Sequence, residues 1–307
     1  MSLPGFSDKA YWEEQLQNYV DCGARSMWDN GGVWDYFKHC IRTQNRFFFQ
    51  NPLLPVILSR FEQNTFILQA DVSVYRARVD HKRECENQCW LAKDLQDIEN
   101  AQKDGEKSKT ELGSAIEEYY KQQTASIKDN PEYQAFAKRQ ATGFEGFDAE
   151  GSGAAPYDKA ASGRCNPQNV SYLYAANDPH TAVAEVRPFI RDSVSVATLK
   201  PKRDLKLVDF YYQYDKNGTI MITDAFWHKI RCEFSAINKG NTDDYLVTQF
   251  ISALAQHAGY DGLRFRSSLV YEGTNYVIFD GDICTPISSK MYIIPRVTYE
   301  LRPIIPE

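Results

Sequence analysis

The chain has 307 residues, 43% of them hydrophobic and 25% charged, and a formal net charge of −6 from 35 basic and 41 acidic residues. This composition is typical of a globular protein of one or two domains and excludes collagen, a coiled coil and extensive disorder. The negative charge argues against nucleic acid as a partner, and no apolar run approaches the ~20 residues that span a bilayer. The N-terminus has no basic stretch followed by an apolar one, so we expect no signal peptide, reduced cysteines and a cytoplasmic location.

The first part of the chain predicts a helical N-terminal region, residues 1–65. Apolar residues at helical spacing predict two helices within residues 7–50. We expect Pro52 and Pro55 to end the second helix, because proline does not fit a helix interior. Strand-forming residues at 66–79 then mark the start of a second, larger domain, residues 66–307.

Two segments interrupt that domain. Residues 84–142 are polar, with apolar residues at helical spacing, and predict an insertion of two or more amphipathic helices. Residues 143–163 are rich in Gly, Ala and Ser and predict an irregular loop over the surface or over a site. A loop over a site would act as a lid that closes on the substrate.

The second half of the chain predicts a β-rich core. Residues 172–176 form a short strand, and Asp178 and Pro179 then supply the start of a helix that ends before Pro188. A second helix is predicted over residues 244–257 and ends at Gly259. Further strands are predicted at residues 194–199, 205–210, 263–265, 276–279 and 291–301.

Several kinds of site are excluded by their missing motifs. The chain has no phosphate-binding loop, no zinc-protease motif, no Gly-x-Ser-x-Gly and no Cys-x-x-Cys pair. His81, Cys85 and Cys89 share a face if their segment is helical, but they lack a fourth ligand and the spacing of a zinc module. We therefore expect neither a metal ion nor a bound cofactor.

Four segments carry residues that could bind or act on a substrate. Arg164, in Gly163-Arg164-Cys165-Asn166-Pro167, lies in a rigid turn and suits an anion, although it also fits an ordinary surface turn. Glu185 lies among small and apolar residues, which favours either a functional carboxylate or an ion pair with Arg187. Arg76 lies in a strand, where an edge position would also explain it. Ser267 has no His or Asp at motif spacing, so a hydrogen-bonding role is favoured over a nucleophile.

Taken together, these segments resemble the RES domain family, named for its Arg, Glu and Ser. Arg76, Glu185 and Ser267 stand for the three residues. Residues 163–167 resemble the Gly-Arg-x-Asn-Pro turn of the family, residues 172–176 resemble its Leu-Tyr-x-Ala strand, and Asn275 precedes the last core strand. The motifs occur in order over residues 66–279.

The resemblance implies an α+β fold, with an ADP-ribosyltransferase-like mixed β core, and the destruction of NAD+ as a substrate. We expect Glu185 to stabilise the ribose cation, and Arg76 and Arg164 to hold the pyrophosphate. Ser267 and Asn275 would position Arg76 or the ribose. Tyr174 either stacks on a ring of the substrate or is a core tyrosine.

The resemblance also sets the expected function and partners. Hydrolysis of NAD+ in a toxin-like or defence role is the first interpretation, and a phosphorylase or a transferase that modifies a macromolecule is the alternative. An inactive module that binds a nucleotide or a partner is an alternative of another class. Expected partners are NAD+, an antitoxin or immunity protein, and a second copy of the chain.

Overall fold

The computed structural model of the chain describes residues 8–22, 32–44, 50–82, 84–105, 111–212, 225–236 and 245–298. The chain forms two compact units. Unit 1 contains Met1–Val74, Ala154–Thr181 and Lys200–Cys284, and unit 2 contains Tyr75–Gly153, Ala182–Leu199 and Thr285–Glu307. Helices and strands occur in both, so the predicted α+β class is confirmed.

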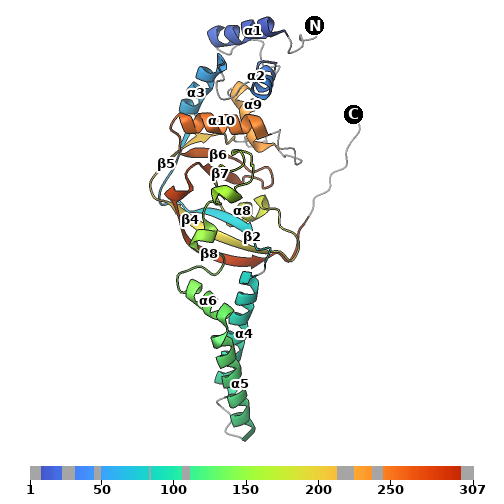
Figure 1. Ribbon diagram of the computed structural model, residues 1–307, viewed down its shortest axis with the longest axis vertical. Helices are drawn as coiled ribbons and strands as arrows, with labels where there is room; N and C mark the ends of the chain where they lie inside the picture. The colour runs from blue at the N-terminus through green and yellow to red at the C-terminus, as the bar shows by residue number, and fades with distance from the viewer. Residues whose placement is uncertain are drawn as a thin grey trace, which may run out of the picture. The chain divides into compact units, whose positions relative to one another are not determined.

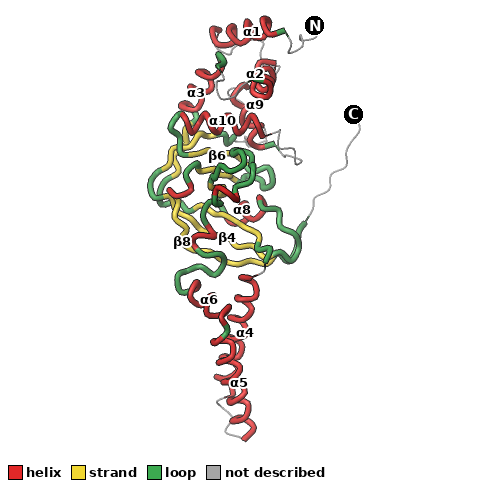
Figure 2. Tube along the Cα trace, viewed as in Figure 1, coloured by secondary structure: helices red, strands yellow, loops and turns green. Residues whose placement is uncertain are grey.

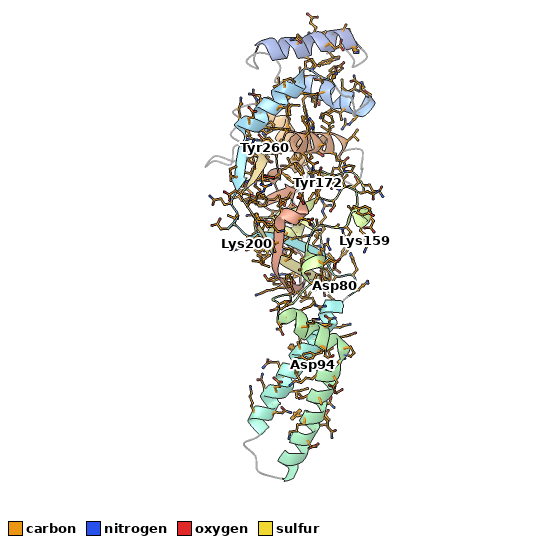
Figure 3. All side chains as sticks on the ribbon, turned by 60° about the vertical axis from the view of Figure 1, so that its left-hand side comes forward. Asp80, Asp94, Lys159, Tyr172, Lys200 and Tyr260 are labelled. Atoms are coloured by element: carbon orange, nitrogen blue, oxygen red, sulfur yellow. The ribbon has the colours of Figure 1, made fainter. Side chains whose placement is uncertain are left out.

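The N-terminal helices belong to the core of unit 1. The helices α1 (Lys9–Cys22) and α2 (Gly32–Thr43) confirm the two predicted helices. In Figure 1, α2 lies beside α9 (Ala225–Ser235) and α10 (Leu246–His257), and α1 lies next to α2. Trp12 and Phe37 are almost fully buried in one hydrophobic cluster with Trp227 of α9 and Ile251 of α10. Tyr172 and Tyr260, labelled in Figure 3, belong to the same cluster. The region 1–65 therefore shares its core with strands and helices of the predicted catalytic domain.

One helix of unit 1 corrects the prediction for Pro52 and Pro55. These prolines do not only follow a helix; they begin a new one, α3 (Leu53–Gln63). Pro52 is its N-cap and Pro55 lies in its first turn, where a backbone N–H has no partner within the helix. The side chain of Asn51 accepts a hydrogen bond from the Leu53 N–H at 3.0 Å and so caps the helix start.

The described residues of unit 1 contain five hydrogen-bonded strands in the order β1-β5-β6-β7-β3. Neighbouring strands are antiparallel except β5 and β6, which are parallel. Their core-facing side chains, such as Leu263 and Val277, pack into the cluster formed by the helices. The strands are β1 (Thr65–Leu68), β3 (Leu173–Ala176), β5 (Leu205–Asp209), β6 (Gly262–Arg266) and β7 (Thr274–Ile278), and a short 3-10 helix, η5 (Gly281–Ile283), follows β7.

Unit 2 contains the remaining strands, in the order β2-β4-β8, and the helical insertion. The strands are β2 (Val74–Val79), β4 (Ser193–Pro201) and β8 (Cys284–Ile293). The insertion consists of α4 (Glu84–Gly105), α5 (Glu111–Asp129) and α6 (Pro131–Gln140), with α4 packed against both others (Figure 2). This confirms the amphipathic helices predicted from 84–142.

The last predicted strand, residues 291–301, is shifted in the structure. The strand β8 starts at Cys284 and ends at Ile293, because Pro295 has no N–H to continue a ladder. Residues 299–301 lie outside the described residues. The predicted irregular loop at 143–163 is largely irregular and contains two short helices, α7 (Ala149–Ser152) and η3 (Tyr157–Lys159). Within the described part of the chain, no helix has the length and apolar character needed to cross a membrane.

Candidate functional site

The Gly-Arg-x-Asn-Pro turn in unit 1 is held by an internal network of hydrogen bonds. The Asn166 side-chain amide donates to the carbonyl oxygens of Ala161 at 2.9 Å and Val170 at 2.8 Å. Asn166 is 3% exposed, so these bonds satisfy donors that have no access to water. A Cβ atom at Gly163 would lie 2.6 Å from Asn166 Oδ1 and 2.8 Å from the Tyr174 hydroxyl, so the turn requires glycine at this position.

Tyr174 closes this network from β3. Its hydroxyl donates to Asn166 Oδ1 at 2.7 Å and accepts from the Cys165 backbone N–H at 3.0 Å. Burial raises the pKa of the Tyr174 hydroxyl well above its ordinary value. Tyr174 is half-buried and packs against the hydrophobic cluster, and its stacking on a ring of the substrate stays a prediction.

The helix α10 supports the turn with two side chains that the sequence did not single out. Gln249 Nε2 donates to the carbonyl oxygens of Gly163 at 2.8 Å and Asn166 at 3.0 Å. Thr248 Oγ1 donates to the carbonyl oxygen of Arg164 at 2.6 Å. Because these bonds join residues more than 80 positions apart, no local sequence signal indicates them.

Arg164 uses its guanidinium to cap a helix. Its Nη1 donates to the carbonyl oxygen of Glu233 at 2.9 Å and its Nη2 to that of Ala236 at 2.5 Å. Both acceptors lie at the C-terminal end of α9, where carbonyl groups lack partners within the helix and a cation is favourable. The guanidinium carbon also lies 5.6 Å from the centre of the Tyr245 ring. These contacts differ from the predicted role of Arg164 in holding a pyrophosphate.

Ser267 and Asn275 belong to the hairpin formed by β6 and β7. Ser267 is 4% exposed, and its Oγ accepts hydrogen bonds from the N–H groups of Leu269 and Val270, each at 3.1 Å. Its own N–H donates to the carbonyl oxygen of Gly273 at 2.8 Å. Ser267 therefore shapes the loop between the strands. Asn275 is buried in β7 and pairs with Phe265 of β6 and Ala176 of β3.

Glu185 is the last residue of the short helix α8 (Pro179–Glu185). As predicted, Asp178 caps this helix: its carboxylate accepts from the Thr181 N–H at 2.9 Å and from the Thr181 hydroxyl at 2.6 Å. Its small and apolar neighbours do not bury Glu185, because its side chain is exposed whereas that of Ala182 is buried. The Glu185 side chain is therefore accessible from solvent.

Arg76 lies in β2, in unit 2 with Glu185. By strand alternation it shares a face with Arg78, while Ala77 faces the opposite side and is buried. Arg78 donates to the carbonyl oxygens of Gly151 at 2.6 Å and Gly153 at 3.2 Å, and burial lowers its pKa. The sequence did not predict this second arginine, which fixes the glycine-rich loop from a neighbouring position.

The predicted site residues thus fall into two sets. Unit 2 carries Arg76 and Glu185, and unit 1 carries Arg164, Tyr174, Ser267 and Asn275. In unit 1, side-chain hydrogen bonds fix the backbone at two places. Tyr174 holds the turn at residues 163–167, and Ser267 holds the loop between β6 and β7. Among the described residues, no group of three or more His, Cys, Asp or Glu is placed to hold a metal ion. The side chain of Cys85 lies outside the described residues.

Comparison with known proteins places this arrangement in a family. No curated protein sequence matches the chain. A solved structure with a similar chain is the M. tuberculosis MbcT-MbcA toxin-antitoxin complex, with a TM-score of 0.35, 8% sequence identity, and coverage of 77% of this chain and 91% of that chain. The family model of the RES domain matches residues 129–296, which include every predicted site residue except Arg76. Because this match spans more than half of the 307 residues, the chain belongs to the RES domain family.

Proposed function

We propose that the chain cleaves the bond between nicotinamide and ribose in NAD+, with water as the acceptor, in a toxin-like or defence role. Membership of the RES domain family carries this proposal, because the matched residues 129–296 contain both Glu185 and Ser267 in the expected order. The exposure of Glu185 supports it, since a carboxylate that acts on a substrate needs access to one.

The reaction breaks the bond between ribose C1′ and the nicotinamide nitrogen. The bonding electron pair leaves with nicotinamide, which becomes neutral, and the positive charge moves to the ribose as an oxocarbenium-like state. Water then adds to C1′ and loses a proton, so the products are nicotinamide, ADP-ribose and one proton. In this proposal Glu185 stabilises the developing positive charge on the ribose, an electrostatic effect that is among the largest in catalysis.

The remaining residues divide into binding and supporting roles. Arg76 keeps the proposed role of binding the pyrophosphate, because a guanidinium offers a fork of donors to such an anion. The contacts of Arg164 and Tyr174 favour a supporting role, in which they hold the turn and the end of α9. Ser267 supports the proposal through the loop that its hydroxyl organises.

The test compares purified wild-type protein with Glu185→Gln in the presence of NAD+ and follows nicotinamide by chromatography. The variant should release nicotinamide at least ~10²-fold more slowly, because it loses the charge that stabilises the cation. Glu132→Gln is the matched control, since Glu132 is an exposed carboxylate on α6. Equal rates for the wild type and Glu185→Gln would overturn the assignment of Glu185, and a wild type that releases no nicotinamide would overturn the activity.

The same experiment identifies the acceptor. ADP-ribose as the product supports a hydrolase, its 1-phosphate formed in phosphate buffer supports a phosphorylase, and labelled ADP-ribose attached to protein or nucleic acid supports a transferase. If intact, folded protein releases no nicotinamide from NAD+, the result would support an inactive binding module. An antitoxin or immunity protein and a second copy of the chain stay predictions.

A further inference from the structure

Two arginines of β6 form a feature that the proposed chemistry does not use. Arg264 and Arg266 alternate with Leu263 and Phe265, which pack into the hydrophobic cluster of unit 1. Because side chains alternate along a strand, both arginines lie on the face opposite that cluster. This face therefore carries two neighbouring positive charges within unit 1.

Each of these arginines lies against two aromatic rings. The guanidinium carbon of Arg264 is 4.2 Å from the centre of the Phe66 ring and 4.6 Å from that of Tyr211. The guanidinium carbon of Arg266 is 5.6 Å from the Tyr212 ring and 5.1 Å from the Tyr271 ring. These distances are within the range of cation–π contacts.

The aromatic rings around Arg264 and those around Arg266 differ in their exposure to solvent. Arg264 Nη1 forms an ion pair with Asp209 at 3.2 Å, and the rings of Phe66 and Tyr211 are half-buried. In contrast, Arg266 is 6% exposed whereas Tyr271 is 73% exposed. The Tyr271 ring thus contacts a buried guanidinium and leaves most of its surface to solvent.

The loop that carries Tyr271 is fixed at several points. Ser267 organises its first half, and the Gly273 N–H donates to the carbonyl oxygen of Val270 at 3.1 Å. A Cβ atom at Gly273 would lie 2.9 Å from Thr181 Oγ1, so the end of the loop fits closely against α8. A ring held on such a loop binds a ligand with little loss of conformational freedom.

We propose that Tyr271 is the stacking platform for the adenine ring of NAD+, and that Arg266 is the residue that positions it. This inference rests on the proposed function. In NAD+, adenine is a neutral aromatic ring joined through a ribose to the pyrophosphate, so the positive charge of Arg266 attracts the adenylate half of the substrate. The nicotinamide ring of NAD+ is itself a cation, which the same charge repels. The platform therefore selects the adenylate end over the nicotinamide end.

The test compares two substrates that share the scissile bond: NAD+ and nicotinamide mononucleotide, which lacks the adenylate half. Tyr271→Ala should raise KM for NAD+ at least about fivefold, equivalent to about 1 kcal/mol of lost stacking, with kcat nearly unchanged. It should leave KM for the mononucleotide unchanged. Tyr271→Phe should behave as the wild type, because the ring is kept.

The supporting variants separate stacking from general damage. Arg266→Met should shift KM for NAD+ in the same direction as Tyr271→Ala, with a smaller effect on the mononucleotide. Tyr119→Ala removes a tyrosine of α5 that is 58% exposed and should change neither KM. An unchanged KM for NAD+ in Tyr271→Ala, or an equal rise for both substrates, would overturn the proposed platform.

Failure of the platform is distinguishable from failure of the proposed activity. If the wild type releases no nicotinamide, the activity is refuted, and calorimetric titration with ADP-ribose then tests the platform directly. ADP-ribose should bind the wild type at least about fivefold more tightly than it binds Tyr271→Ala. Equal affinity, or no binding to the wild type, would overturn the platform as well.

Discussion

Replacing Arg164 tests whether this residue binds a substrate or caps a helix. Its guanidinium donates to two carbonyl oxygens at the end of α9, those of Glu233 and Ala236. A hydrogen bond from a charged donor contributes about 1.5–3 kcal/mol to stability, and Arg164 is only half-buried, which lowers the sum. We therefore expect Arg164→Ala to reduce the free energy of unfolding by about 2–4 kcal/mol.

The assay is thermal and urea-induced unfolding of the full chain. A loss of this size should lower Tm by about 4–10 °C in a protein of this length. Arg42→Ala is the matched control, because Arg42 is exposed in the last turn of α2, and its removal should change stability by less than about 0.5 kcal/mol. Arg164→Lys should recover only part of the loss, since an ammonium lacks the planar fork that reaches two carbonyls.

The activity of the same variants decides between the two roles. If Arg164 caps α9, the KM for NAD+ should stay unchanged at temperatures where Arg164→Ala is folded. A variant as stable as Arg42→Ala but with a KM for NAD+ raised tenfold or more would refute the capping role. It would restore the prediction that Arg164 binds the pyrophosphate.

Three further predictions follow from the site. Gly163→Ala should destabilise the fold by at least about 1 kcal/mol in urea-induced unfolding, because the added Cβ would meet Asn166 and Tyr174; an unchanged midpoint would contradict the required close approach. Burial alone would raise the pKa of Asp178, but hydrogen bonds from the start of α8 outweigh burial and lower that pKa. The ionised Asp178 therefore stabilises the fold above the unfolded pKa of about 3.9, and this stabilisation is lost as the pH falls through the lower pKa of the folded state. Asp178→Asn should therefore show a smaller loss of stability between pH 5 and pH 2, as followed by circular dichroism, and an equal loss would contradict this. Burial raises the pKa of Cys165 to about 12, so its thiol should resist alkylation at pH 8 until the protein unfolds, and rapid labelling detected by mass spectrometry of the native protein would show that the turn opens.

Much of the fold could be predicted because it depends on local patterns. The helices of the insertion follow from apolar residues at helical spacing, and the start of α8 follows from Asp178 and Pro179. The helix α3 was missed because Pro52 and Pro55 indicate a stop when they follow a helix and a start when they precede one. The helix α9 was also missed, although its Phe226, Ile230 and Phe234 repeat at helical spacing.

The sequence predicts which residues belong to the candidate site, but it does not predict their hydrogen-bond partners. Arg164 finds its acceptors 69 and 72 positions along the chain, and both are backbone carbonyls, which leave no mark in the residue types. Glu185 has small and apolar neighbours in the sequence and is nevertheless exposed, because a helix places successive residues on different faces. Exposure and capping are properties of the tertiary structure, so the sequence alone could not assign them.

These contacts change how loss of activity in this family member should be interpreted. Asn166, Tyr174 and Ser267 each satisfy buried backbone or side-chain groups, so their removal leaves unpaired donors or acceptors at a cost of about 1–3 kcal/mol each. A variant at any of them can lose activity by unfolding, without touching the substrate. Glu185 and Tyr271 are exposed, and their variants are expected to stay folded. At such exposed positions a change in kcat or KM reports directly on chemistry or binding, which is why the main variant of each proposal is placed there.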